Sequence, residues 1–100
     1  MKKKTVVSST IIDREVKEMM DAYITESGIL TAAFLEKALN LYEEAGQEFK
    51  EYDIQDPVKF PLRMYDISKA KVDELAKSRS LKRNMIWNQA IKDYVIIKRK

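Results

Sequence analysis

The sequence contains no cysteine and no histidine among its 100 residues. The absence of cysteine excludes disulfide bonds and thiolate zinc sites, and the absence of histidine removes the side chain that most often acts as a general base or metal ligand. An enzyme built on carboxylates alone is compatible with this composition, but acidic residues such as Glu43 and Glu44 have no convergent partners in the predicted structure. We therefore expect a protein that is not an enzyme and that binds no metal or cofactor.

The sequence also lacks a long apolar run. No stretch approaches the length that crosses a bilayer, and no apolar block follows the opening Met-Lys-Lys-Lys as it would in a signal peptide. We expect a cytoplasmic protein that does not enter a membrane. A chain of 100 residues with 45% apolar residues fits one compact domain with a modest core.

The net charge of +3 hides a division along the chain. Residues 1–56 contain 7 Lys and Arg against 12 Asp and Glu, a net charge of −5, whereas residues 57–100 contain 12 against 4, a net charge of +8. The basic second half favours a polyanion as partner. The alternative is two solvated surfaces of opposite charge that attract one another.

A shift of 52 residues aligns the two halves of the sequence. Residues 28–42, GILTAAFLEKALNLY, then match residues 80–94, SLKRNMIWNQAIKDY. Apolar residues recur at spacings of three and four in both segments, which predicts a helix of about four turns with one buried face. Matched apolar pairs upstream predict a shorter helix before each long one. The matched pairs include Met20 and Val72, Tyr23 and Leu75, Ile29 and Leu81, Phe34 and Ile86, Leu35 and Trp87, and Ala38 and Ala90.

A strand precedes the helices in each half. In residues 58–64 apolar residues alternate with Lys59, Pro61 and Arg63, so an extended strand places these three on its outer face. The first strand, residues 5–12, has two candidate registers, because a slip of one residue exchanges its faces. The preferred register turns Thr5, Val7 and Ser9 outward, and the other turns Lys4, Val6, Ser8 and Thr10 outward.

Residues typical of helix ends separate these elements. Asp13 is the predicted N-cap of the first short helix, and Asp66 or Ser68 is the candidate in the second half. Gly28 is expected to close the first short helix with a positive φ. Ser80 stands at the equivalent position of the second half, where its side chain disfavours that conformation.

Neither half buries its apolar face alone, because an isolated ribbon and isolated short helices are only marginally stable in water. We therefore expect residues 5–12 and 58–64 to pair antiparallel over four helices. The predicted fold is mainly α with a two-stranded antiparallel ribbon, in the order β-α-α-β-α-α. Residues 1–46 form the first repeat and residues 57–100 the second, and the acidic segment 47–56 connects them within one compact domain.

This pattern resembles the ribbon-helix-helix superfamily of DNA-binding proteins, over residues 3–45 and 57–96. The residues that carry the resemblance are the two matched segments GILTAAFLEKALNLY and SLKRNMIWNQAIKDY, which occur twice in register. The resemblance implies a tandem pseudo-dimer whose ribbon enters the major groove of double-stranded DNA. It also implies a transcriptional repressor, although the family serves plasmid copy control, partition, conjugative transfer and antitoxins as well.

The resemblance assigns roles to two groups of residues. The outward ribbon residues would contact bases, and the starts of the long helices together with the N-terminal arm would contact phosphates. The family favours a serine or threonine cap at the start of the long helix, and Leu30 and Lys82 depart from this pattern. The expected base contacts are Thr5, Val7, Ser9, Lys59, Pro61 and Arg63. The expected phosphate contacts are Lys2, Lys3, Lys4, Thr31, Lys82, Arg83 and Asn84.

Two questions stay open at the level of the sequence. One is the class of function, because an adaptor whose acidic first half recruits a protein partner would show the same charge division. A steep loss of affinity with rising salt would favour DNA over that alternative. The other is the oligomeric state, either a monomeric pseudo-dimer or a homodimer of tandem repeats.

Overall fold

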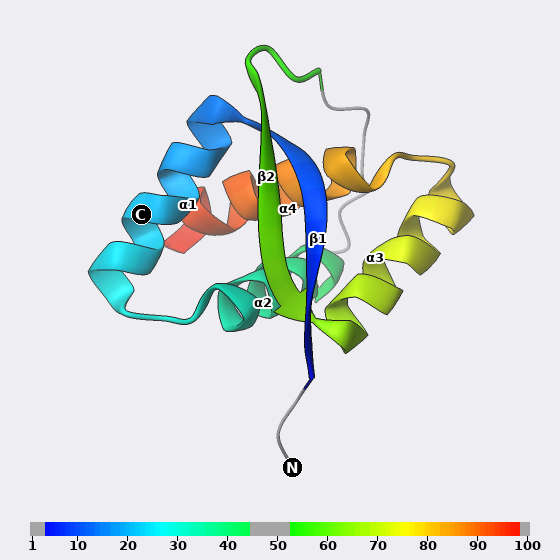
Figure 1. Cartoon of the computed structure of the whole chain (residues 1–100), viewed down its shortest axis with the longest axis horizontal. Helices are drawn as coiled ribbons and strands as arrows, with labels where there is room; N and C mark the ends of the chain where they lie inside the picture. The colour runs from blue at the N-terminus through cyan, green and yellow to red at the C-terminus, as the bar shows by residue number, and fades with distance from the viewer. Residues whose placement is uncertain (1–3, 45–52, 99–100) are drawn as a thin grey trace.

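A computed structural model gives the structure of the protein and describes residues 4–44 and 53–98. The order strand, helix, helix occurs twice in it, as the sequence predicts (Figure 1). The predicted connection, residues 47–56, lies partly outside the described residues. The elements are β1 (Thr5–Asp13), α1 (Arg14–Ser27), α2 (Thr31–Glu44), β2 (Pro57–Tyr65), α3 (Asp66–Arg79) and α4 (Arg83–Lys98).

Each element of the second half begins 52 residues after its counterpart in the first half, as the sequence alignment of the halves predicts. α1 and α3 begin at residues 14 and 66, and α2 and α4 begin at residues 31 and 83. The short helices also end in the same way, because Gly28 has a φ of 72° and Ser80 has a φ of 55°. The prediction for Gly28 is confirmed, and Ser80 adopts the left-handed conformation despite its Cβ atom.

β1 and β2 pair antiparallel and form a two-stranded ribbon. Ser9 lies opposite Pro61 at the centre of the ribbon, and these two residues are also equivalent under the 52-residue shift. In Figure 1 the ribbon crosses the front of the molecule, with α1 on one side, α3 on the other and α4 behind it. Each predicted strand is confirmed and is slightly longer in the structure.

The start of α1 is held by the neighbouring strand region rather than by a capping side chain. The N–H of Arg14 donates to the carbonyl of Asp56 over 2.9 Å. Asp13 occupies the N-cap position, but its side chain makes no capping hydrogen bond, and its carboxylate accepts the N–H of Gln55 at 3.2 Å. The predicted N-cap position of Asp13 is therefore confirmed, but its side chain does not cap α1.

The start of α3 repeats this arrangement. The N–H of Asp66 donates to the carbonyl of Lys4 over 2.9 Å. Tyr65 occupies the N-cap position, so Asp66 and Ser68, the two predicted caps, lie inside the first turn of the helix. Both predictions are wrong, because the helix already begins at Asp66, and Lys4, the residue before β1, supplies the acceptor for its first N–H.

The core lies between the inner face of the ribbon and the helices, chiefly α2 and α4. It contains the apolar positions that the two halves share, and Phe34 and Trp87 are its largest fully buried side chains. Tyr23, Phe34 and Tyr94 bring α1, α2 and α4 together, with ring centroids 5.3 to 5.6 Å apart. Tilted and edge-to-face contacts of this kind stabilise a core beyond simple area burial.

One buried polar side chain fixes the ribbon on the helices. Asn88 of α4 accepts the N–H of Asp13 at 2.8 Å through Oδ1. Its Nδ2 donates to the carbonyl of Ile11 at 3.2 Å and to that of Asn84 at 2.6 Å. Because this amide is fully buried, its hydrogen bonds specify how the end of β1 sits on α4.

Within residues 4–44 and 53–98, no helix has the length and apolar character needed to cross a membrane.

Candidate nucleic-acid interface

The outer face of the ribbon carries the candidate base-contacting residues. β1 exposes Thr5, Val7 and Ser9, as the preferred register predicts. The alternative register is wrong, because it would turn Thr10 outward and this residue is buried. The inner face of the ribbon packs on the core, so its outer face is the surface available for a partner.

β2 presents its outward residues as predicted. Lys59, Pro61 and Arg63 are exposed, whereas Leu62 and Met64 between and after them are buried in the core. Lys59 takes part in no ion pair with any residue in the described ranges. Its ammonium group is therefore available to a ligand.

Ile11 belongs to the same face, although it is not among the residues predicted to contact DNA. It is 42% exposed and lies opposite Lys59, while Val7 is 54% exposed and lies opposite Arg63. The 52-residue shift contains this signal, because it matches Val7, Ser9 and Ile11 with Lys59, Pro61 and Arg63. These six residues form the ribbon face.

Thr5 lies beyond the ribbon face, at the end of β1. Its Oγ1 accepts a hydrogen bond from Nη1 of Arg63 at 3.3 Å, so it orients that guanidinium group. Lys59 and Arg63 are four residues apart on one strand, which corresponds to about 13 Å along the ribbon. Each end of the ribbon face therefore has one cation beside one aliphatic side chain.

The starts of the long helices flank the ribbon. α2 begins at Thr31 and is preceded by Leu30, whose side chain is 72% exposed and whose carbonyl accepts the N–H of Phe34. α4 begins at Arg83 and is preceded by Lys82, whose carbonyl accepts the N–H of Met85 at 3.1 Å. The first N–H groups of a helix attract anions, and the cations at α4 add to this attraction.

Asp73 of α3 restrains two of the cations beside the ribbon. Its Oδ1 lies 3.1 Å from Nη1 of Arg83, and its Oδ2 lies 3.0 Å from Nζ of Lys69. Burial acts to raise the pKa of Asp73, but the hydrogen bonds from Lys69 and Arg83 outweigh it and hold this pKa below its usual range. Asp73 is not among the residues predicted from the sequence, although Lys69 and Asp73 have the spacing of a helical ion pair.

The predicted N-terminal arm is described only in part. Lys4 is exposed at the start of β1 and holds α3 through its carbonyl. Lys2 and Lys3 lie outside the described residues. Asn84, also predicted to contact phosphate, lies in the first turn of α4 and is half-buried.

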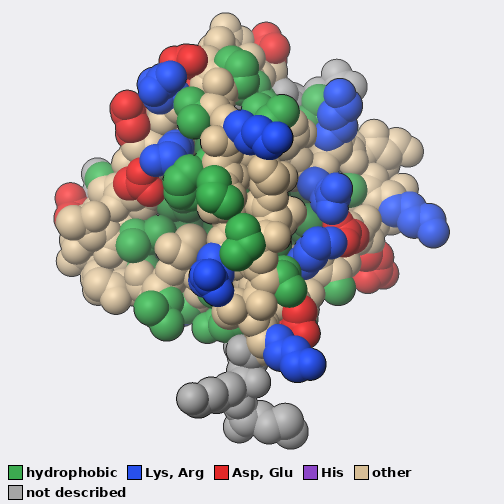
Figure 2. All heavy atoms as spheres, in the orientation of Figure 1, with side chains coloured by type: hydrophobic (Ala, Val, Ile, Leu, Met, Phe, Trp, Pro, Cys, Tyr) green, Lys and Arg blue, Asp and Glu red, His purple; other side chains and the backbone are tan. Residues whose placement is uncertain are grey.

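Figure 2 shows the side of the molecule that carries the ribbon. Lys and Arg side chains are spread across this side, and hydrophobic side chains lie between them along the ribbon. Within the described part of the chain, no group of three or more acidic residues is arranged to hold a metal ion. The surface has the mixture of cations and small apolar groups that suits base edges and phosphates.

Comparisons of the chain with protein-family models, with curated proteins and with solved structures gave no match. The assignment of a function rests on the geometry of the ribbon face and its surroundings.

Proposed function

We propose that the protein is a sequence-specific double-stranded DNA-binding protein of the ribbon-helix-helix type and acts as a transcriptional repressor. The observation that carries this proposal is the ribbon face, where Lys59 and Arg63 extend from a two-stranded antiparallel ribbon whose other face is buried. The major groove of B-DNA admits such a ribbon. Neither a metal, a cofactor nor a catalytic role is part of the proposal.

We propose further that the chain is a tandem pseudo-dimer. The 52-residue offset between the two sets of elements and the pairing of Ser9 with Pro61 at the ribbon centre support this arrangement. Each half contributes one strand and two helices, as one subunit of a two-chain ribbon-helix-helix protein does. A single chain then supplies the complete reading surface.

In this proposal the two ends of the ribbon face read the two halves of one operator. Arg63 and Lys59 donate to O6 and N7 of guanine, and each good contact discriminates against a wrong base by roughly 1 to 3 kcal/mol. Val7 and Ile11 lie opposite these cations and fit the methyl group of thymine. Since an arginine donates two hydrogen bonds in a fixed geometry and a lysine does not, the two operator halves differ in sequence.

The helix starts bind the DNA backbone on either side of the ribbon in this proposal. α4 supplies Lys82 and Arg83, whereas the equivalent positions at α2 are Leu30 and Thr31. The contact at α4 is therefore the stronger one electrostatically. Phosphate contacts orient the protein on the duplex, and they make its affinity depend on salt.

The test is selection of bound sequences from a random DNA duplex library at near-physiological salt. Three proteins are compared: the wild type, Lys59→Ala/Arg63→Ala, and the control Lys77→Ala/Arg79→Ala, which removes the same charge from the exposed last turn of α3. We expect a short enriched motif for the wild type and the control, and loss of this motif for the ribbon variant.

Two results would contradict the proposal. If the wild type enriches no sequence, base reading is rejected, and an adaptor or a nonspecific basic protein explains the charge better. If the ribbon variant selects the same motif as the wild type, the reading surface lies elsewhere.

A further inference from the structure

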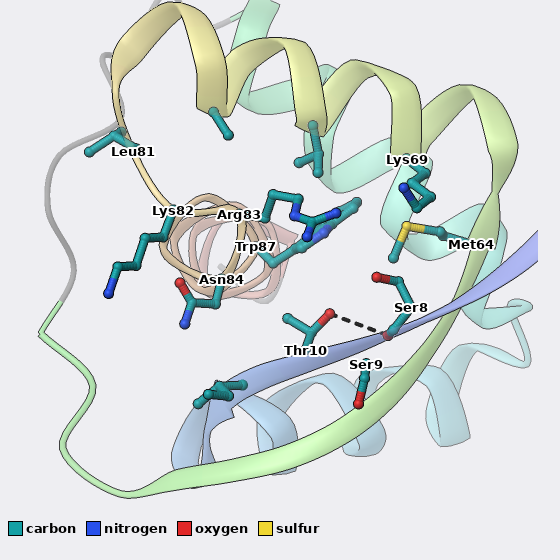
Figure 3. Close-up of a pocket in the computed structure, with 13 residues that line it drawn as sticks. Ser8, Ser9, Thr10, Met64, Lys69, Leu81, Lys82, Arg83, Asn84 and Trp87 are labelled. Carbon is teal, nitrogen blue, oxygen red and sulfur yellow. Dashed lines mark hydrogen bonds between the residues drawn. The ribbon is translucent and has the colours of Figure 1, made fainter.

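A hollow of about 400 Å³ lies beneath β1, beside α3 and the start of α4 (Figure 3). Its apolar lining includes Met64, Val72 and Trp87, which belong to the core. Ser8 and Thr10 extend into the hollow from the inner face of β1. The volume is that of a small-molecule site.

The other half of the molecule fills the equivalent space with hydrophobic side chains. The 52-residue shift matches Ser8 with Phe60 and Thr10 with Leu62. Phe60 packs against the core, with Nζ of Lys17 at 4.5 Å from its ring centroid, and Leu62 is fully buried. The hollow therefore results from two small polar residues of β1 at positions where β2 has large apolar ones.

The polar groups around the hollow favour an anion. Figure 3 shows Arg83 approaching from α4 and Lys69 from α3, whereas Lys82 points away from the gap. Asp73 neutralises only part of the charge of the two approaching cations. A negatively charged group at this place gains attraction from both cations and from the start of α4.

The hollow also contains a polar atom that lacks a partner. Oδ1 of Asn84 is buried and accepts no hydrogen bond from any residue in the described ranges. Such an acceptor is costly to leave unpaired. A ligand with an N–H or O–H group beside its anionic group would satisfy it.

We propose that this hollow binds a small organic anion with a flat apolar body and a hydrogen-bond donor. The apolar body lies against Ala76 and Leu81, the partly buried apolar residues of the lining, the anionic group lies near Lys69 and Arg83, and the donor pairs with Asn84. Binding at this place needs no DNA and is independent of the proposed function.

A regulatory consequence follows, and this step rests on the proposed DNA binding. Arg83 is assigned both to the anionic group of the ligand and to a DNA phosphate. The two partners then compete, so the ligand lowers the affinity for DNA and DNA lowers the affinity for the ligand by the same factor.

The probe for the site is 8-anilinonaphthalene-1-sulfonate, which has a flat aromatic body, one sulfonate and one N–H group. Wild type is compared with Ser8→Phe and Thr10→Leu, which introduce the residues of the other half, and with Thr25→Phe, which adds a phenyl group on the exposed side of α1. We expect one saturable site on wild type and on Thr25→Phe, and at least tenfold weaker binding by Ser8→Phe and Thr10→Leu. Circular dichroism confirms that each variant is folded.

The role of the charge is measured with N-phenyl-1-naphthylamine, which has the same rings and N–H group without the sulfonate. We expect at least tenfold weaker binding of this neutral probe to wild type. Either of two results would overturn the proposed site: unchanged sulfonate binding by the folded Ser8→Phe and Thr10→Leu variants, or equal binding of the two probes.

Competition with DNA is measured separately, by adding a duplex that wild type selects. Displacement of the sulfonate probe supports the regulatory step, and simultaneous binding of probe and duplex rejects it. If no duplex is selected, the proposed function fails while the probe titration still decides whether the hollow is a ligand site.

Discussion

Asp73 determines how much positive charge beside the ribbon is available to a polyanion. It lies between Lys69 and Arg83 and forms an ion pair with each of them. A phosphate that approaches Arg83 must replace a carboxylate that is already in place. The carboxylate stays ionised at neutral pH because its pKa lies below the ordinary value of 3.8.

Replacement of Asp73 by asparagine is expected to strengthen DNA binding. Both Arg83 and Lys69 are then free to contact phosphate, and we expect a gain in affinity of roughly two- to fivefold, the range of exposed ion pairs. The dependence of affinity on salt should become steeper by about one phosphate contact. The measurement is a fluorescence-anisotropy titration at several salt concentrations.

The matched control for this variant is Glu74→Gln, which removes one negative charge from the neighbouring exposed position of α3. An equal gain in affinity from both variants would show that only net charge matters. The restraint of Arg83 by Asp73 would then have no role in DNA binding.

Single residues were predictable from the sequence wherever alternation alone determines their environment. The outward positions of β2 and the preferred register of β1 follow from the period of two, and the structure confirms both sets of exposed residues. Ile11 has the same parity as Thr5, Val7 and Ser9 but was not named among the expected base contacts. The structure places it on the outer face, between buried Thr10 and Ile12.

At the scale of the elements, Asn88 connects α4 to the end of β1. It accepts the N–H of Asp13 and donates to the carbonyl of Ile11, both in the last three residues of β1. The equivalent residue of the first half is Glu36. Asn88 is fully buried whereas Glu36 is partly exposed, so the two halves differ at this position.

The variant Asn88→Ala is expected to lower the free energy of unfolding by about 2 to 4 kcal/mol, because it leaves buried polar groups of β1 without partners. Denaturant unfolding followed by circular dichroism measures this loss. The control is Asn40→Ala on the partly exposed face of α2, which removes a single hydrogen bond from Nζ of Lys71 and should cost about 1 kcal/mol. A similar loss for both variants would show that the buried hydrogen bonds of Asn88 stabilise the fold no more than this partly exposed one.

The ends of the short helices provide a reciprocal pair of variants. Ser80 has a left-handed backbone, which disfavours any residue with a Cβ atom, and Gly28 has the same backbone without that cost. We expect Ser80→Gly to raise the free energy of unfolding by about 0.5 to 1 kcal/mol and Gly28→Ser to lower it by a similar amount.

A Cβ atom added at Gly28 meets no other atom within 4 Å, so the expected loss is due to the backbone conformation alone. Chemical denaturation of both variants tests the pair. The prediction requires that the free energy of unfolding rises in Ser80→Gly and falls in Gly28→Ser. If it falls in both variants, the serine side chain itself stabilises the end of α3.

The order and type of the elements were predictable because the apolar positions repeat with the period of a helix or a strand. The start of α1 was predicted at the right residue and that of α3 was not, and the partner that holds each start could not be predicted, because it is a backbone acceptor far away in the sequence. Arg14 bonds to Asp56, and Asp66 bonds to Lys4. The short-range rule for capping side chains does not include such partners.

At the scale of the whole molecule, both strands of the ribbon and all helices of the core belong to one chain. We expect a monomer whose unfolding midpoint does not change over a hundredfold range of protein concentration, since folding then involves no association step. Size-exclusion chromatography with light scattering and denaturant unfolding at several concentrations provide the measurement. A midpoint that rises with concentration would indicate that two chains exchange their halves.

The hollow beneath β1 could not be predicted from the sequence repeat. The aligned halves share their apolar helix positions, and the sequence therefore predicts a common core. The space arises where the inner faces of the strands differ, at Ser8 and Thr10 against Phe60 and Leu62. Whether such a difference leaves a hollow depends on how the neighbouring helices close over it, which only the assembled structure shows.

The presence of both strands in one chain also affects how the proposed DNA recognition can evolve. In a homodimer every substitution appears twice, so both halves of a symmetric operator lose affinity at once. Here a substitution at Lys59 alters one end of the ribbon face and leaves Arg63 at the other end unchanged. An operator of this protein can therefore change one half at a time, and new specificity can arise by single mutational steps.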